Sequence, residues 1–127
     1  MALGRRNEGV EAGILRQGFD VRFLDDRRML GRVIAVRHII RTEKPDLVHT
    51  MLFHSDMLGR ISPVGTGVKV LSTVVNTDYS PVRLSDPTIS SLRLRLARSI
   101  DGWTTRHLAH HVHANSQAVK SAAIRDM

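Results

Sequence analysis

The order of apolar and polar positions along the chain predicts alternating helices and strands. Apolar residues that return every three or four positions predict a first helix from residue 7 or 8 to Gly18, and a second over residues 28–43. Between them, residues 19–24 alternate apolar and polar side chains, which is typical of a strand. Pro45 then excludes continuation of the second helix, because proline has no amide hydrogen to donate.

The rest of the chain continues this alternation. Runs rich in β-branched residues predict three strands, at residues 47–51, 68–75 and 112–115. Three further helices are predicted at residues 55–63, at residues 89–110, and from Gln117 to the C-terminus. Ser55 or Asp56 is the expected N-cap of the first of these helices, and Ser116 of the last.

The helix predicted over residues 89–110 has one apolar side and one basic side. The apolar side is expected to face the core and carries Ile89, Leu92, Leu96, Ile100 and Trp103. The far side carries Arg95, Arg98 and Arg106. Residues 76–87, which collect asparagine, aspartate, serine and proline, predict a long loop before this helix.

This order of elements predicts the fold class. Strands separated by helices need crossover connections, so the chain is expected to form an α/β Rossmann-like parallel sheet flanked by helices. With 127 residues, it has room for a single domain over residues 1–127. Ligands of such sheets bind at the carboxyl ends of the strands. The polar residues at those ends are Asp25, Asp26, residues 50–56, residues 73–79, Asn115 and Ser116.

Charge and composition narrow the classes of partner. A formal charge of +7 favours anionic partners, among them phosphates, acidic lipid headgroups and nucleic acid. Nucleic acid is disfavoured because only three phenylalanines, one tyrosine and one tryptophan are present as stacking platforms. The absence of cysteine excludes a disulfide framework and a thiol nucleophile. No signal peptide or membrane-spanning run is visible, so a cytoplasmic location is expected.

Several segments carry a resemblance to a known family. Residues 44–60, KPDLVHTMLFHSDMLGR, resemble a segment in the N-terminal domain of family 4 glycosyltransferases of GT-B fold. Residues 15–24, 70–74 and 112–119 resemble further segments of that domain and follow in the right order. Two positions depart from the family pattern, since Met51 and Val75 stand where histidines are common.

The resemblance implies a retaining hexosyltransferase that moves a sugar from a nucleotide-sugar co-substrate to a glycan or lipid-linked acceptor. It implies one half of a GT-B fold, the acceptor-side domain, with the first strand missing. The C-terminal donor domain, a required partner, is expected to be absent, because its paired glutamates have no counterpart among Glu8, Glu11 and Glu43. A fragment of this kind is expected to be inactive alone.

Five residues are candidates to face the acceptor or donor. His49 and His54, at the end of a predicted strand and in the turn after it, can bond a sugar hydroxyl or a phosphate. Alternatively, His49 bonds a backbone carbonyl and His54 caps the next helix. Asn76 and Asp78 suit an acceptor sugar or simple turn chemistry. Ser116 suits an anion at a helix N-terminus or plain capping.

No metal site and no cofactor are predicted. His107 and His111 stand four positions apart, but no nearby carboxylate or cysteine completes a ligand set. A second functional hypothesis stays open beside the glycosyltransferase. In it, the chain is a non-enzymatic binding or regulatory module whose basic surface meets anionic ligands or a membrane. A peripheral position at the inner membrane face is compatible with both hypotheses.

Overall fold

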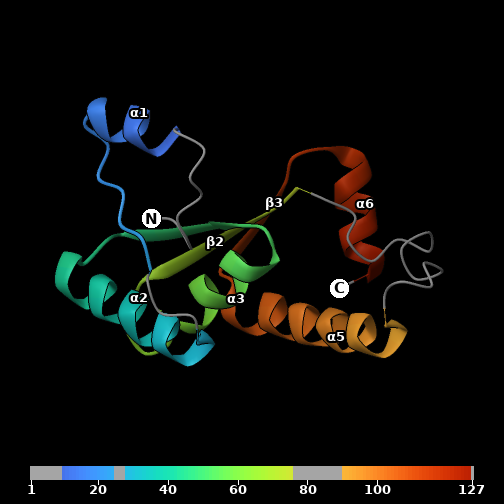
Figure 1. Ribbon diagram of the computed structural model, residues 1–127. Helices are drawn as coiled ribbons and strands as arrows, with labels where there is room; N and C mark the ends of the chain where they lie inside the picture. Colours follow the sequence, from blue (N-terminus) through green and yellow to red (C-terminus); the bar gives the residue numbers. More distant parts are fainter. Residues whose placement is uncertain (1–9, 25–27, 76–89, 127) are drawn as a thin grey trace.

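The computed structural model describes residues 10–24, 28–75 and 90–126 of the chain (Figure 1). Its elements in chain order are α1 (Val10–Arg16), α2 (Met29–Glu43), β1 (Leu47–Met51), α3 (Phe53–Ile61), β2 (Lys69–Val74), α5 (Ser91–Leu108), β3 (His111–Ala114) and α6 (Gln117–Asp126). The predicted loop over residues 76–87 lies outside the described residues.

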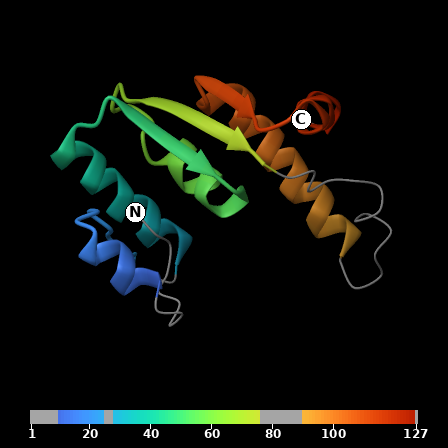
Figure 2. The ribbon, with the colours of Figure 1, turned by 90° about the horizontal axis from the view of Figure 1, so that it is seen from above.

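The three strands form a parallel sheet in the order β1-β2-β3. Thr50 of β1 stands opposite Ser72 of β2, and Thr73 of β2 stands opposite His113 of β3. Figure 2 shows the arrows of β1 and β2 pointing the same way. A parallel sheet flanked by helices confirms the predicted α/β, Rossmann-like class. The carboxyl ends of all three strands therefore lie at one edge of the sheet.

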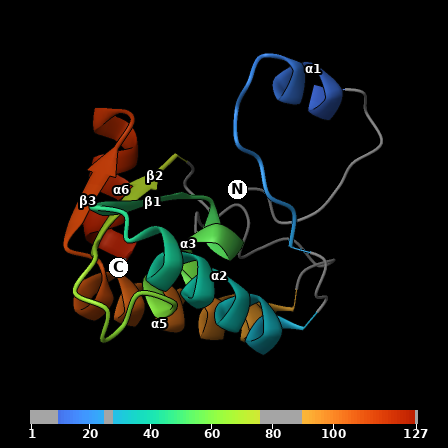
Figure 3. The ribbon, with the colours of Figure 1, turned by 90° about the vertical axis from the view of Figure 1, so that its left-hand side faces the viewer.

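Helices α2, α3 and α5 lie on one side of the sheet (Figure 1). Helix α3 packs against β1 and β2, with α2 and α5 packed on it. The apolar core lies among these elements and is formed by Leu24, Val36, Ile40 and Leu58, with Val48 and Val68 beside them. Helix α6 packs against β2 and β3, whereas α1 stands apart from the sheet (Figures 1 and 3).

The strand predicted over residues 19–24 does not form. Only Phe23 makes an isolated bridge there. Instead, Leu24 inserts into the apolar core and the Arg22 guanidinium pairs with Glu43 at the end of α2, at 2.9 Å. An alternating pattern predicts an extended backbone, but a strand also needs a neighbour for its ladder. The described part of this segment forms that single bridge and no ladder, so it is not a strand of the sheet β1-β2-β3.

Helix α3 begins earlier than predicted and without the expected cap. It starts at Phe53, after Leu52 turns the chain with a φ of 74°, and no side chain caps it. Ser55 and Asp56 thus lie inside the helix, and Asp56 points inward to buried partners. The cap predicted at the last helix is confirmed, because the Val119 amide donates to Ser116 Oγ at 3.2 Å.

Helix α5 does not face the core with the apolar side that was predicted to do so. Leu92, Leu96, Ile100 and Trp103 are exposed to solvent, although their spacing predicted a core-facing side. The buried side carries Asp101, Gly102, Thr104 and Thr105 instead. The physical reason is the buried Arg60 on α3, whose guanidinium needs polar partners from the neighbouring helix.

Candidate functional site at the carboxyl edge of the sheet

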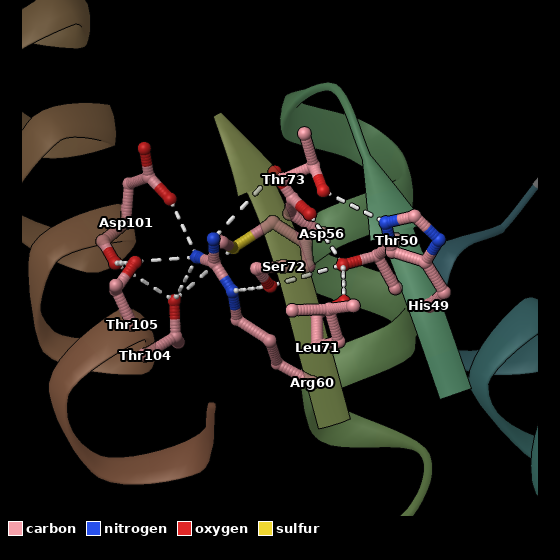
Figure 4. A network of polar contacts seen from close by, with 11 residues as sticks. His49, Thr50, Asp56, Arg60, Leu71, Ser72, Thr73, Asp101, Thr104 and Thr105 are labelled. Carbon is pink, nitrogen blue, oxygen red and sulfur yellow. Dashed lines mark hydrogen bonds and ion pairs between the residues drawn. The ribbon is translucent and has the colours of Figure 1, made fainter. Parts of the chain in front are cut away.

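His49 is the central residue of β1, on the sheet face opposite Thr50. Its Nε2 atom forms a 2.7 Å hydrogen bond with Oγ1 of Thr73 on β2, which Figure 4 shows between the two strands. The ring thus bonds a side-chain hydroxyl rather than a backbone carbonyl. Because Thr73 stands opposite His113, one face of the sheet carries an imidazole, a hydroxyl and a second imidazole on three successive strands.

Ser116 lies at the start of α6, directly after β3. Its hydroxyl accepts the Val119 amide, so it caps the helix. A groove beside it is lined by His113, Ser116, Gln117 and Lys120 among other residues. Its other lining residues are apolar, namely Val112, Ala114, Ala123 and Ile124. Lys120 is the lysine in this lining and favours an anion there, and the positive end of the α6 dipole lies at Ser116. The structure therefore brings Ser116 together with His113, which sequence reasoning did not select.

The other candidate residues, His54, Asn76 and Asp78, are not brought together with His49 or Ser116 by the described structure. His54 is exposed near the start of α3, where its ring stands edge-on to the Phe53 ring at 5.6 Å. It does not cap the helix, because the cap of α3 involves no side chain. Among the described residues, no hydrogen bond joins His54 to His49 or Ser116. Asn76 and Asp78 lie outside the described residues.

A buried polar network supports this edge of the sheet from the helical side (Figure 4). Its centre is Arg60 of α3, whose side chain is completely buried. The guanidinium donates to Asp101 Oδ1 at 2.6 Å, to Ser72 Oγ at 2.9 Å and to Thr104 Oγ1 at 3.2 Å. Three residues, one from β2 and two from α5, thereby bond one cation of α3.

The network continues to β1 through Thr50. The Thr50 hydroxyl is 2.5 Å from Asp56 Oδ1 and 3.0 Å from Ser72 Oγ. Asp56 also pairs with Arg60, since its Oδ2 lies 3.5 Å from Nη2. Burial raises the pKa of the Asp56 carboxyl, and the nearby Asp101 carboxylate raises it further, while Thr50, Arg60 and Ser72 oppose this rise. Two carboxylates thus share one arginine in a water-poor interior.

The network fixes the elements whose ends carry the candidate residues. Thr50 and Ser72 are the neighbours in sequence of His49 and Thr73, respectively, and point to the opposite face. Gly59 allows the close approach of α3, because a Cβ at this position would overlap the Thr50 side chain. Sequence reasoning missed the network. Its one visible signal is the spacing of four between Asp56 and Arg60, the two charged residues of α3.

His107 and His111, which are four positions apart in the sequence, do not lie on the same helix. Helix α5 ends at Leu108, and His111 lies in β3. His107 instead rests against Trp103, with ring centroids 5.1 Å apart. In the part of the chain that the structure describes, no group of three histidines, aspartates or glutamates is placed to hold a metal ion. No helix within the described ranges is both long and apolar enough to span a bilayer.

The fold defines a class of protein: a parallel, Rossmann-like α/β domain, and proteins of this class bind ligands where their strands end. A family model described as a glycosyl transferase 4-like domain matches residues 3–127. The chain therefore belongs to the glycosyl transferase 4-like family. Comparisons with curated proteins and with solved structures give no significant match.

Proposed function

We propose that this domain forms the acceptor side of a retaining glycosyltransferase. The enzyme moves a sugar from a nucleotide-sugar donor to a glycan or lipid-linked acceptor. A donor-binding domain outside these residues completes the site. The match to the glycosyl transferase 4-like family over residues 3–127 is the observation that carries this proposal. No metal or cofactor is needed for the roles assigned below.

The acceptor lies on the sheet face that carries His49, Thr73 and His113. Hydroxyl groups of a sugar both donate and accept hydrogen bonds, and imidazole nitrogens and threonine hydroxyls can do the same. His49 is held by Thr73 at 2.7 Å, which fixes the direction of its ring. The ring's second nitrogen, Nδ1, is then the atom that bonds an acceptor hydroxyl.

The groove at Ser116 faces the phosphates of the donor. Backbone amides at the start of α6 are oriented toward an anion at that end, and Lys120 lines the same groove. A leaving diphosphate gains charge during sugar transfer, so donors fixed around it lower the barrier. Ser116 has both roles in this proposal, since it caps α6 and lines the groove.

The departures at Met51 and Val75 favour a second candidate function. A domain that has lost polar side chains next to its strands can retain binding without transfer, as a regulatory module for anionic ligands. The two candidates differ in one outcome. The enzyme needs a second domain for turnover, whereas the module has no turnover in any form.

The test measures nucleoside diphosphate release from UDP-, GDP- and ADP-hexoses. It compares the 127-residue chain with the same chain extended by the reading frame that follows Met127. We expect turnover only from the extended form. His49→Ala should lower that turnover about tenfold, equivalent to ~1.4 kcal/mol, because one oriented hydrogen bond is lost.

His38→Ala is the matched control, because His38 is an exposed histidine on α2, away from the strand ends. It should leave turnover unchanged. Turnover by the 127-residue chain alone contradicts the division of labour between two domains. An extended form with paired glutamates and no turnover on any of these donors favours the regulatory module.

A further inference from the structure

Helix α5 presents its large apolar side chains to solvent and its polar side chains to the core. Leu92, Leu96, Ile100 and Trp103 are between 43% and 76% exposed. On the buried side, Asp101 and Thr104 bond the Arg60 guanidinium, and Thr105 donates to the Asp101 carbonyl at 2.7 Å. This arrangement is the reverse of an ordinary surface helix, whose apolar stripe packs on the core.

The exposed apolar residues form one continuous stripe. Their spacing of four, four and three places Leu92, Leu96, Ile100 and Trp103 on one side of the helix over three turns. Scattered exposed leucines are common on protein surfaces, but a contiguous apolar stripe marks an interaction site. Figure 1 shows α5 at the lower margin of the molecule, with no described element beyond it.

Basic residues border this stripe on both sides. Arg95 and Arg106 follow one side of it and Arg93 the other, at 100° per residue. Arg95, Trp103, Arg106 and His107 line a groove on this face. Asp101 is the only carboxylate of α5, and it is buried against Arg60. The exposed face of α5 is therefore apolar along its centre, and the charged side chains at its margins are all basic.

We propose that α5 docks this domain on the surface of a bilayer that contains anionic lipids. The apolar stripe enters the boundary between headgroups and acyl chains, and the flanking arginines meet the lipid phosphates. Trp103 suits this depth, because an indole has an apolar body and one polar N–H group. Charge complementarity favours a lipid surface over a second copy of this basic chain. The proposal stands on α5 alone and is independent of sugar transfer.

Trp103 also supplies the assay, because it is the only tryptophan of the chain. The purified chain is mixed with vesicles of phosphatidylcholine and phosphatidylglycerol in equal amounts, or of phosphatidylcholine alone. With the anionic vesicles, the emission of Trp103 should shift to shorter wavelength, and lipids with brominated acyl chains should quench it. Added salt should weaken the binding, because it screens the arginines.

Two exposed substitutions on α5 separate the apolar and the basic contributions. Leu96→Gln should weaken partitioning about tenfold, because its side chain no longer enters the bilayer boundary. Arg106→Gln should weaken it about fivefold, from the loss of one charge near the lipid surface. The matched controls are Leu30→Gln and Arg41→Gln on α2, at exposed positions away from α5. Both should bind like the unmodified chain.

Three results would overturn the proposal. The first is an unchanged Trp103 emission with anionic vesicles. The second is equal loss of binding in Leu96→Gln and Leu30→Gln, which would mean that the stripe on α5 is not the contact. The third is an emission shift without vesicles that grows with protein concentration, because this would show that a second copy covers the stripe. Since all four substitutions are at the surface, circular dichroism should show the same fold in each.

Discussion

Replacing Arg60 with methionine removes the cation at the centre of the buried network. The arginine and methionine side chains have similar lengths and fill similar space, so the substitution acts mainly on charge and hydrogen bonds. The guanidinium is completely buried and bonds Asp101, Ser72 and Thr104. In the variant, the Asp56 and Asp101 carboxylates stay buried without their cation. The side chains of both aspartates are less than a tenth exposed, so water does not take the place of the missing guanidinium.

The expected cost follows from this burial. Removing one partner of a buried ion pair costs about 3–5 kcal/mol, because the other charge is left without compensation. A domain of this size has a total stability of about 5–15 kcal/mol, so the variant should be largely or fully destabilised. Adding Asp56→Asn and Asp101→Asn to Arg60→Met should restore at least about 1 kcal/mol, because no buried charge then remains unpaired.

Urea unfolding followed by circular dichroism measures these differences. Arg41→Met is the matched control, because Arg41 lies exposed on α2, and its effect should stay within about 0.5 kcal/mol. A cost below about 1 kcal/mol for Arg60→Met would refute the reasoning. A further loss of stability on adding the two asparagines would also contradict this prediction, because the cost is expected to come from buried carboxylates without their cation.

Gly59 and Asp56 of α3, and Ser116 before α6, each allow a further test. Gly59→Ala should destabilise by about 1–3 kcal/mol in the same urea assay, because the new methyl overlaps Thr50, and an unchanged midpoint would show that α3 can shift. Burial raises the pKa of Asp56 in the folded protein above its unfolded value of 3.8. The stability that this group contributes is therefore full below pH 3.8, and it is lost as the pH rises through the pKa of the folded state. The stability of the unmodified chain relative to Asp56→Asn should therefore fall as the pH rises above 3.8, and a rise would contradict the assigned cause. Ser116→Ala should cost about 1 kcal/mol, and Ser116→Asp should restore it, because aspartate also caps a helix. In the proposed two-domain enzyme, Ser116→Asp should nevertheless weaken donor binding while Ser116→Asn does not, since only aspartate repels a phosphate, and equal binding by both would exclude the phosphate role.

Local patterns predicted most of the helices and strands. β1 matches its predicted bounds, and β2, β3 and α2 differ by a residue or so, because β-rich runs and Pro45 act through the local backbone. The prediction of a strand at residues 19–24 was wrong for a different reason. The side chains of this segment do alternate between apolar and polar, but a strand also needs a neighbouring strand to pair with. The local sequence pattern does not show whether such a neighbour is present.

The orientation of α5 could not be predicted from its own sequence. Periodicity shows which residues share a side, but not which side faces the core. Here a single buried arginine on α3 decides it, because Arg60 draws Asp101 and Thr104 inward across the helix interface. The candidate site has the same limitation. Sequence reasoning selected His49 near the end of a predicted strand and Ser116 after another, and it placed Thr73 among the polar residues at a strand end. That Thr73 bonds His49 and stands opposite His113 follows only from the contacts and the register of the sheet.

The central claim is that ligands of sugar transfer bind at the carboxyl edge of the sheet. Amide proton–nitrogen NMR spectra of the 127-residue chain, titrated with UDP-glucose, GDP-mannose and simple methyl glycosides, test it most directly. We expect the shifts to concentrate around His49, Thr73 and residues 113–117. Shifts confined to the amino ends, at Leu47, Lys69 and His111, or no shift with any of these probes, would contradict it.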